Sequence, residues 1–388
     1  MANIFDIAFS LTPRLGSRAI KGLIESFFSA ENIFSQSYDT LIATGLLRED
    51  VARGLVGRVA FADAQKQLDH CSRYEIEAIS MCDEYYPPSL REISDPPFVI
   101  YLQGNKEVLT RNIISIIGAR KSSSYGERVT STIVSDLGKS VYNLVIASGL
   151  AFGIDSIAHR NALMHDIPTI AFLPTALPEV TPAAHANLAK EIIKSGGCIV
   201  SEVAAVTSAA HCKPNYMQRN RLVVGSAAAT VVVECGYGGG AYKAAINAID
   251  EGVVVGAVPG RVGDAGAFGC NLLLASKVAF MVLGGESILR ELNWDDRRLD
   301  PNDDENRKNV KGSVDVVSSI GKFTGEQLLL LRCFSEDEPF HISDLLRASN
   351  FPIGVVTAML MELTVLGVVN PLPGSRYERI IPLSDIKE

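Results

Sequence analysis

The stretch Ile113-Ile114-Ser115-Ile116-Ile117-Gly118-Ala119-Arg120 decides the fold, because it joins a short apolar run to a small, basic turn. The same pattern repeats as far as Val282. Six further runs, largely apolar and rich in β-branched residues, are separated by segments long enough for a helix: 144–147, 169–173, 198–202, 230–234, 253–255 and 278–282. Such runs are typical of strands buried on both faces. The sequence therefore predicts an α/β fold with a Rossmann-like, doubly wound, mostly parallel sheet.

The turn from Gly118 to Gly126 is the first place where a ligand is expected. Ligands of such sheets bind beyond the carboxyl ends of the strands. The turn carries Arg120 and Lys121, and its serines can cap the next helix, whose N-terminus has free N–H groups and a partial positive charge. These features suit a phosphate or an anionic backbone, although an ordinary capped turn is an equal alternative. The turn matches neither GxGxxG nor a Walker loop, so neither a dinucleotide nor a hydrolysed triphosphate is indicated.

The turn after the second run contains Gly149 and Gly153 and leads into a helix with Asp155 and His159. An Asp/His pair can act in catalysis. A surface or satisfied pair is favoured here, because no nucleophile with a recognisable elbow stands nearby.

The most polar part of the core lies between residues 213 and 221. It combines three cations, an aromatic ring and an amide: Lys213, Tyr216, Arg219, Asn220 and Arg221. Cations neutralise phosphates, and a tyrosine ring can stack on a base, which contributes about 1–3 kcal/mol. The alternative is that the two arginines pair with acidic residues such as Glu202 or Glu234 and only hold loops.

A glycine-rich loop from Gly236 to Gly240 precedes another helix, which carries Lys243. Its backbone N–H groups could line an anion-binding concavity, and a flexible turn that permits tight packing is an equal alternative. His211, Cys212 and Cys270 match no zinc spacing, so we expect no metal site and no cofactor.

The composition excludes several classes of protein. The chain has 388 residues, of which 47% are hydrophobic and 21% charged, so two or three globular domains are expected. The net charge of −8 argues against a wholesale nucleic-acid binder but is compatible with a local basic site. Seven scattered cysteines favour a reduced, cytoplasmic location. The N-terminus does not resemble a signal peptide, and no apolar run reaches transmembrane length.

The predicted domains flank the core, which we place at 71–294. Residues 1–70 form a small helical domain, either a docking or dimerisation module or, less favoured, a helix-hairpin-helix DNA binder. Within 71–112, paired prolines favour extended chain over helix, and 98–102 could be an edge strand. Residues 295–321 are a charged linker. Residues 322–388 are expected to form a winged helix, and the few cations on its third helix favour a protein partner over base reading.

Taken together, the motifs resemble those of the DNA-processing protein A (DprA, also called Smf) family. The resemblance covers the whole core and agrees with a three-part layout. It rests on motifs in the family's order and spacing: Tyr86-Pro87-Pro88, Asp95-Pro96-Pro97, Ile117-Gly118-Ala119-Arg120 with Tyr125-Gly126, Ser148-Gly149-Leu150-Ala151 with Gly153-Ile154-Asp155 and His159, Arg219-Asn220-Arg221, Ala257-Val258-Pro259-Gly260 and Gly269-Cys270-Asn271.

The resemblance implies a Rossmann-like core that binds single-stranded DNA, forms homodimers and loads the RecA recombinase during natural transformation, without catalysis. It implies a DNA pocket at Gly118, Arg120, Lys121, Gly149, Lys213, Tyr216, Arg219, Asn220 and Lys243. In this interpretation Arg120 and Lys213 contact phosphates, Tyr216 stacks on a base, and Gly118 and Gly149 allow close approach.

Two departures from the family pattern affect this pocket. Tyr216-Met217 replaces the usual Phe-Pro, which keeps a stacking face. Ala241 and Ala244 stand where the family usually has a serine and a threonine, so two hydroxyls are missing.

The competing interpretation is an enzyme, a Rossmann-like nucleotide phosphoribohydrolase of the lysine-decarboxylase-like group. That group relies on a Pro-Gly-Gly-x-Gly-Thr-x-x-Glu motif. This chain has neither the Thr nor the Glu after Gly240, so DNA binding is favoured. A scaffold for partner proteins is compatible with DNA binding.

Overall fold

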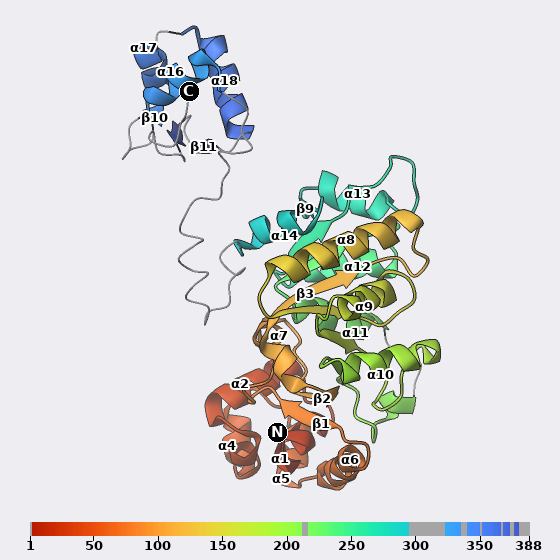
Figure 1. Cartoon of the computed structure of the whole chain (residues 1–388). Coiled ribbons are helices and arrows are strands. Elements are labelled where there is room, and N and C mark those ends of the chain that lie inside the picture. Colours follow the sequence, from red (N-terminus) through yellow and green to blue (C-terminus); the bar gives the residue numbers. More distant parts are fainter. Residues whose placement is uncertain are drawn as a thin grey trace, which may run out of the picture. The chain divides into compact units, whose positions relative to one another are not determined.

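The computed structural model describes residues 2–211, 216–294, 323–334, 340–349, 351–365, 368–372 and 376–379. The chain divides into two compact units, Met1–Asp300 and Pro301–Glu388, and each is described by itself (Figure 1). The predicted linker at 295–321 lies outside the described residues. None of the described helices has both the length and the apolar composition needed to cross a bilayer.

A nine-stranded sheet forms the centre of the first unit. Its strand order is β1-β2-β6-β5-β4-β3-β7-β8-β9, and the pairs from β6 to β9 are all parallel. The parallel strands are β3 (Asn112–Ile117), β4 (Leu144–Ser148), β5 (Thr169–Phe172), β6 (Cys198–Ser201), β7 (Ala229–Val232), β8 (Val254–Ala257) and β9 (Phe280–Met281). The predicted Rossmann-like, doubly wound class is confirmed, and the seven apolar runs correspond to these seven strands.

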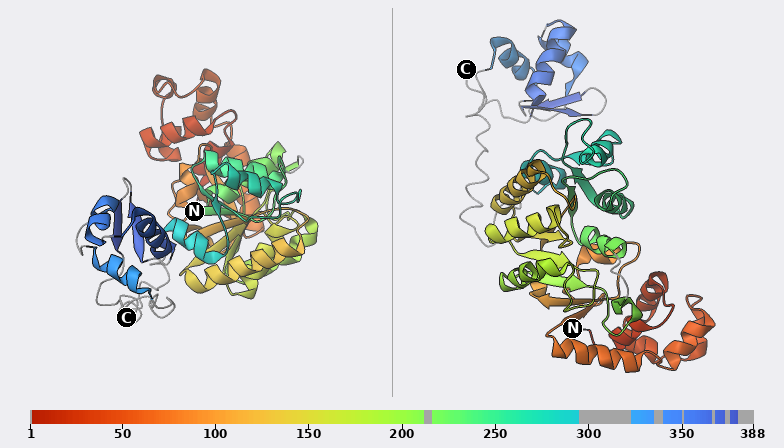
Figure 2. Two further views of the ribbon diagram at one scale, coloured as in Figure 1. Left: turned by 90° about the horizontal axis from the view of Figure 1, so that it is seen from above. Right: turned by 90° about the vertical axis from the view of Figure 1, so that its right-hand side faces the viewer.

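Helices cover both faces of this sheet, as the views in Figure 2 show. On one face Ile114 and Ile116 of β3 share a core with three helices: α8 (Ser124–Ser140), α9 (Ile154–Met164) and α14 (Gly285–Leu292). On the other face Ile113 and Ile117 share a core with α11 (Tyr216–Gly225), α12 (Gly240–Asp250) and α13 (Phe268–Ala275). Successive strand residues point to opposite faces, and both faces are covered, which is why the runs are apolar at most positions.

The N-terminal segment is helical, as predicted: α1 (Ile4–Leu11), α2 (Ser17–Phe27), α3 (Ala30–Phe34), α4 (Tyr38–Ala43), α5 (Glu49–Val56) and α6 (Phe61–Arg73). Ser29 and Ser37 cap α3 and α4 through their side chains. The hydrophobic core of these helices continues beyond them. It includes Tyr101, which lies in the sheet, and Leu188, which lies in α10 (Ala186–Lys194). The helices and the sheet therefore belong to one compact unit, and the domain boundary at residue 70 stays a prediction.

The segment between the N-terminal helices and β3 differs from expectation in two ways. The predicted edge strand, β2 (Val99–Gly104), is internal, because it pairs antiparallel with β6 and with β1 (Glu77–Ser80), which is the edge. The expectation that paired prolines exclude helix was wrong, because α7 (Pro88–Glu92) begins at the second proline. Proline at the first helical position loses no helical hydrogen bond. Short 3₁₀ helices occur at Lys106–Thr110, Ala183–His185 and Ser208–His211.

In the part that the structure describes, the second unit contains three helices and a small antiparallel sheet of order β10-β12-β11. The elements are α16 (Gly325–Arg332), β10 (Phe340–His341), α17 (Ile342–Ser349), α18 (Ile353–Val365), β11 (Val369–Leu372) and β12 (Arg376–Arg379). It has its own core, which includes Leu330, Leu345 and Leu360. The assignment of this unit as a winged helix stays a prediction.

Candidate functional site

A cavity of about 520 Å³ lies at the carboxyl ends of β3 and β7. The strand order reverses between these two strands, since β4, β5 and β6 continue to one side of β3 and β7, β8 and β9 to the other. Such a switch point is the usual ligand site of an open parallel sheet. The cavity wall comes from the turn after β3, the start of α9, residues along the length of α11, and the glycine-rich loop with the start of α12.

The turn after β3 is held by the residue that follows β7. Ser123 caps α8 by accepting a hydrogen bond from the Gly126 N–H at 3.1 Å. The carboxylate of Glu234 accepts from the Ser123 N–H at 2.9 Å and from the Ser123 hydroxyl. A Cβ on Gly126 would clash with this carboxylate. Glu234 therefore fixes the turn that carries Arg120, and it does not pair with the arginines of α11 as one alternative expected.

Arg219 points inward and holds two strand ends together. Its side chain is 4% exposed, and it donates hydrogen bonds to the carbonyl oxygens of Gly149 and, at 2.6 Å, Phe172. A Cβ on Gly149 would clash with the guanidinium, so this glycine makes room for Arg219. Arg219 lines the cavity although it is buried, whereas Gly149 is not part of the cavity wall. The predicted roles of both in DNA binding stay predictions.

Asp155 is the acidic residue of the cavity wall, and its charge interacts with that of the buried Arg219. Burial raises the pKa of Asp155, and the charge of Arg219 opposes that shift. Burial likewise lowers the pKa of Arg219, which Asp155 opposes. The backbone N–H of Ala151 donates to the Asp155 carboxylate at 3.4 Å. The two opposite charges thus stabilise each other at the floor of the site.

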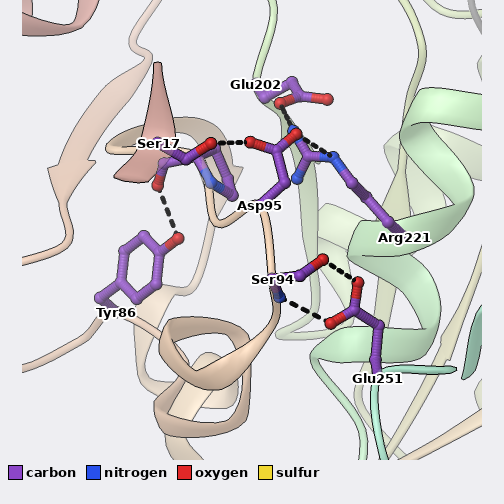
Figure 3. Close-up of polar contacts among 8 residues, drawn as sticks. Ser17, Tyr86, Ser94, Asp95, Glu202, Arg221 and Glu251 are labelled. Atoms are coloured by element: carbon purple, nitrogen blue, oxygen red, sulfur yellow. Dashed lines mark hydrogen bonds and ion pairs between the residues drawn. The ribbon is translucent and has the colours of Figure 1, made fainter. Parts of the chain in front are cut away.

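Arg221 lies on the same helix and forms the ion pair that the sequence suggested. It contacts the carboxylate of Glu202, and its Nε lies 3.5 Å from Asp95 (Figure 3). Burial raises the pKa of Glu202, and Arg221 opposes this shift. Asp95 also accepts a hydrogen bond from the hydroxyl of Ser17 in α2. This network joins the N-terminal helices to α11.

Tyr216, at the start of α11, lies next to the exposed Arg120. The guanidinium carbon of Arg120 lies 4.7 Å from the centre of the Tyr216 ring, and that of Arg219 lies 6.0 Å from it. The Arg219 Nε donates to the amide oxygen of Asn220 at 3.2 Å. Arg120 is exposed, so it is the cation of the cavity wall that a ligand can reach. The site therefore combines an accessible guanidinium with an aromatic ring.

The glycine-rich loop forms the opposite wall. Gly239 is the N-cap of α12 and makes no side-chain cap, so N–H groups of the first turn are available to a ligand. Ala241 and Ala244, where two hydroxyls are missing, both line the cavity. This part of the wall offers backbone donors and apolar surface.

The other predicted residues are distributed as follows. Gly118 lines the cavity and packs on α9, because a Cβ there would lie 2.6 Å from Ile154 Cγ1. Lys121 and Lys243 are exposed but are not part of the cavity wall. Lys213 lies outside the described residues, as does Cys212. Among the described residues no group of three His, Cys, Asp or Glu side chains is arranged to hold a metal.

His159 is fully buried and is not paired with Asp155. Thr169 donates its hydroxyl hydrogen to the Ile146 carbonyl at 2.5 Å, so it accepts from the Nδ1–H of His159 at 2.7 Å. The Nε2 atom of His159 is left without a hydrogen-bond partner. Burial lowers the pKa of His159 to about 3, so the ring is neutral near pH 7. This histidine supports the strands and does not face the cavity.

Several wall residues were missed from the sequence. Asp155 was interpreted as part of a pair with His159, and Val223 and Val224 of α11 were assigned no role. The valines follow Asn220 at helical spacing, which is the signal that could have placed them on the same wall.

The fold and the site define a Rossmann-like α/β protein with a cavity at the switch point of its sheet, whose wall carries an exposed arginine and an aromatic ring. Residues 77–293 match the DNA recombination-mediator protein A family, and the chain belongs to that family. The resemblance found in the sequence is thereby confirmed.

The similarity extends to individual relatives. Protein Smf of Escherichia coli K12 is 30% identical over 298 residues, which cover 76% of this chain and 75% of that protein. The X-ray structure of DNA processing protein A from Streptococcus pneumoniae has a TM-score of 0.60 and 25% identity, with 75% of this chain and 98% of that chain covered. A structure of the Helicobacter pylori protein, described for its single-stranded DNA binding mode, has a TM-score of 0.50 and 25% identity and covers 58% of this chain and 98% of that chain.

Proposed function

We propose that this protein is a recombination mediator that binds single-stranded DNA in the cavity between β3 and β7 and delivers it to the RecA recombinase in natural transformation. The observation that carries the proposal is the contact between Arg120 and Tyr216 beside the free N-terminus of α12. Family membership supports the same conclusion. In this role the protein acts by binding and catalyses no reaction.

The residues of the cavity divide into two groups. Arg120 binds a phosphate, and backbone N–H groups of the α12 start add neutral donors. Tyr216 stacks on a base, which Arg120 uncovers when it turns from the ring toward the phosphate. Lys121 and Lys243 extend the path of the DNA backbone beyond the cavity, and Lys213 contributes a further phosphate contact. Arg219 and Gly149 keep the strand ends in place.

Single strands are preferred over duplex because stacking on Tyr216 needs an unpaired base. A base inside a duplex is already stacked on its neighbours, and extracting it costs a few kcal/mol. The net charge of −8 leaves little general attraction for DNA, so binding depends on this local site.

A homodimer is part of the proposal. The edge of the sheet at β9 exposes apolar side chains, with Met281 51% and Leu283 77% exposed. Light scattering of the purified protein tests this, and a monomer at all concentrations would contradict it.

The test of single-strand binding is the fluorescence anisotropy of labelled oligo-dT of a few tens of nucleotides. Wild type should bind the single strand more tightly than the duplex, with an affinity that falls with salt. Tyr216→Ala should weaken binding by the loss of one stack, about 1–3 kcal/mol, whereas Tyr216→Phe should bind as wild type.

Equal binding by the alanine and phenylalanine variants would contradict the stacking role. No binding to either form of DNA, together with release of ribose 5-phosphate from nucleoside monophosphates, would replace the proposal with the phosphoribohydrolase alternative.

A further inference from the structure

A second cavity, of about 420 Å³, lies within the N-terminal helices and is separate from the site at the sheet. Its wall comes from two helix hairpins: the turn at 12–16 between α1 and α2, and the turn at 44–48 between α4 and α5. Three arginines line it, Arg14, Arg18 and Arg48, and none of its lining residues is acidic. Among the described residues this is a concentration of positive charge that the proposed function does not use.

Both turns have a defined backbone conformation and are packed against the helical core. Arg14 has φ of 63° and Gly45 has φ of 69°, so each turn reverses the chain through a left-handed residue. A non-glycine residue in this conformation is uncommon and is frequent at functional sites. The side chains of Leu15 and Leu46 pack against the core. A Cβ on Gly22 of α2 would lie 2.7 Å from Leu46 Cδ1, so this glycine lets the two hairpins approach closely.

The arginines are only partly neutralised. Arg14 forms an ion pair with Asp50 at 2.7 Å, and Arg48 lies 3.7 Å from the same carboxylate. Arg18 forms no ion pair with any residue that the structure describes. One carboxylate, that of Asp50, is therefore shared by two arginines, so the three arginines together keep an excess of positive charge. In addition, Gly16 provides no side-chain cap to α2, so the N–H groups of its first turn remain available.

We propose that this cavity is a second DNA-binding site, which takes phosphate groups of the DNA backbone and does not read bases. Guanidinium groups bind phosphates through paired hydrogen bonds, and the N–H groups of α2 add donors. No aromatic residue lines the cavity, so it offers no surface for base stacking. Contacts of this kind act on duplex and single-stranded DNA alike. The second site therefore does not distinguish duplex from single-stranded DNA, whereas the cavity at the sheet prefers single strands.

The second site is fixed to the first through the network of Figure 3. Ser17, which lies between Gly16 and Arg18, donates to Asp95, and Asp95 pairs with Arg221 of α11. Arg221 directly follows Asn220, which lines the first cavity. Because both sites belong to one compact unit, the distance between them is fixed, and a DNA molecule with single- and double-stranded parts that matches this distance gains affinity from both.

The test is duplex binding by the full chain with Arg18→Gln and Arg48→Gln together. Both side chains are exposed, so the fold should persist, which circular dichroism checks. The double variant should bind a duplex of a few tens of base pairs about tenfold more weakly than wild type, and the slope of log affinity against log salt should fall by about two. Lys66→Gln with Arg73→Gln removes the same charge from α6 and should change affinity less than about twofold.

Further arms separate this proposal from the first. Arg120→Ala should weaken single-strand binding and leave duplex binding unchanged. Duplex affinity that is equal in wild type and the Arg18/Arg48 variant, or absent from both, would overturn the second site and leave the first intact. Inorganic phosphate at constant ionic strength provides the last arm: stabilisation that depends on Arg18 and Arg48, without duplex binding, would assign the cavity to a free anion and overturn the DNA assignment.

Discussion

At the scale of single residues, Arg219 is a buried cation in the wall of the cavity that supports the surrounding strands. It donates to carbonyl oxygens at the ends of β4 and β5 and lies beside Asp155. Its spacing next to Asn220 suggested a contact with DNA. The inward direction of the Arg219 side chain depends on how α11 packs against the sheet, and this packing cannot be predicted from a local sequence pattern.

Arg219→Met should lower the free energy of unfolding by about 3–5 kcal/mol, because it leaves the charge of Asp155 buried without a partner. Asp155→Asn in the same chain should restore part of this loss, since it removes the unpaired charge. Urea unfolding of both single variants and the double variant measures the coupling. Additive losses would show that the two charges do not interact.

His159 makes stability depend on pH. Its folded pKa of about 3 lies below the ordinary value of about 6.5, so the unfolded chain binds a proton that the folded chain does not. The contribution is fully present above about pH 6.5 and is lost as the pH falls toward about 3. Between about pH 7.5 and about pH 5.5 the free energy of unfolding should fall by about 1.4 kcal/mol from this residue.

His159→Asn tests this contribution, because an amide can replace the Nδ1–H donor but does not titrate. Urea unfolding at both pH values should give a pH dependence about 1.4 kcal/mol smaller in the variant than in wild type. An unchanged pH dependence would mean that the histidine titrates normally in the folded protein.

At the scale of elements, the start of α9 positions the turn that carries Arg120. The N–H of Ile154 donates to the Ala119 carbonyl at 3.1 Å. Gly153, with φ of 75°, lies so close to this turn that a Cβ would clash with the carbonyl oxygen of Ala119. The position of Arg120 therefore depends on a glycine in the next βα unit.

Gly153→Ala should both destabilise the protein and weaken DNA binding, because it displaces the Arg120 turn. Gly196→Ala is the matched control: Gly196 has φ of 81°, but a Cβ there meets nothing within 4 Å. The control should cost about 1–2 kcal/mol of stability and leave DNA binding unchanged. Thermal unfolding and anisotropy measure the two effects, and identical behaviour of both variants would rule out the clash.

The elements that could be predicted are those whose environment repeats along the chain. The strands from β3 to β8 are largely buried on both faces, so each gave an apolar run. The edge strand β9 also lies in an apolar run, although Phe280 is only half-buried and Met281 is exposed. Strand β1 has only four residues and lies at the sheet edge, and α7 is a five-residue helix that begins at a proline. Neither element is long enough to show a recognisable periodicity of apolar residues. For the site, five residues that the sequence predicted as DNA contacts line the cavity: Gly118, Arg120, Tyr216, Arg219 and Asn220. Their contact with DNA stays a prediction. The inward direction of Arg219 and the place of Asp155 depend on tertiary packing.

At the scale of the whole molecule, a chain with a net charge of −8 carries exposed arginines at two cavities. One lies at the switch point of the sheet and combines a guanidinium with an aromatic ring, and the other lies between two helix hairpins. The first suits an unpaired base with its phosphate, and the second suits a backbone alone. This division fits a mediator that works where single strands meet duplex.

The most direct test of the central claim compares oligo-dT binding by wild type, Arg120→Ala and Lys139→Ala. Lys139 is exposed in the last turn of α8, the helix that follows the Arg120 turn, so its loss changes the net charge equally. We expect Arg120→Ala to bind about tenfold more weakly, with a salt slope reduced by about one, and Lys139→Ala to bind as wild type. Equal affinity in all three proteins would contradict a DNA site at the switch point of the sheet.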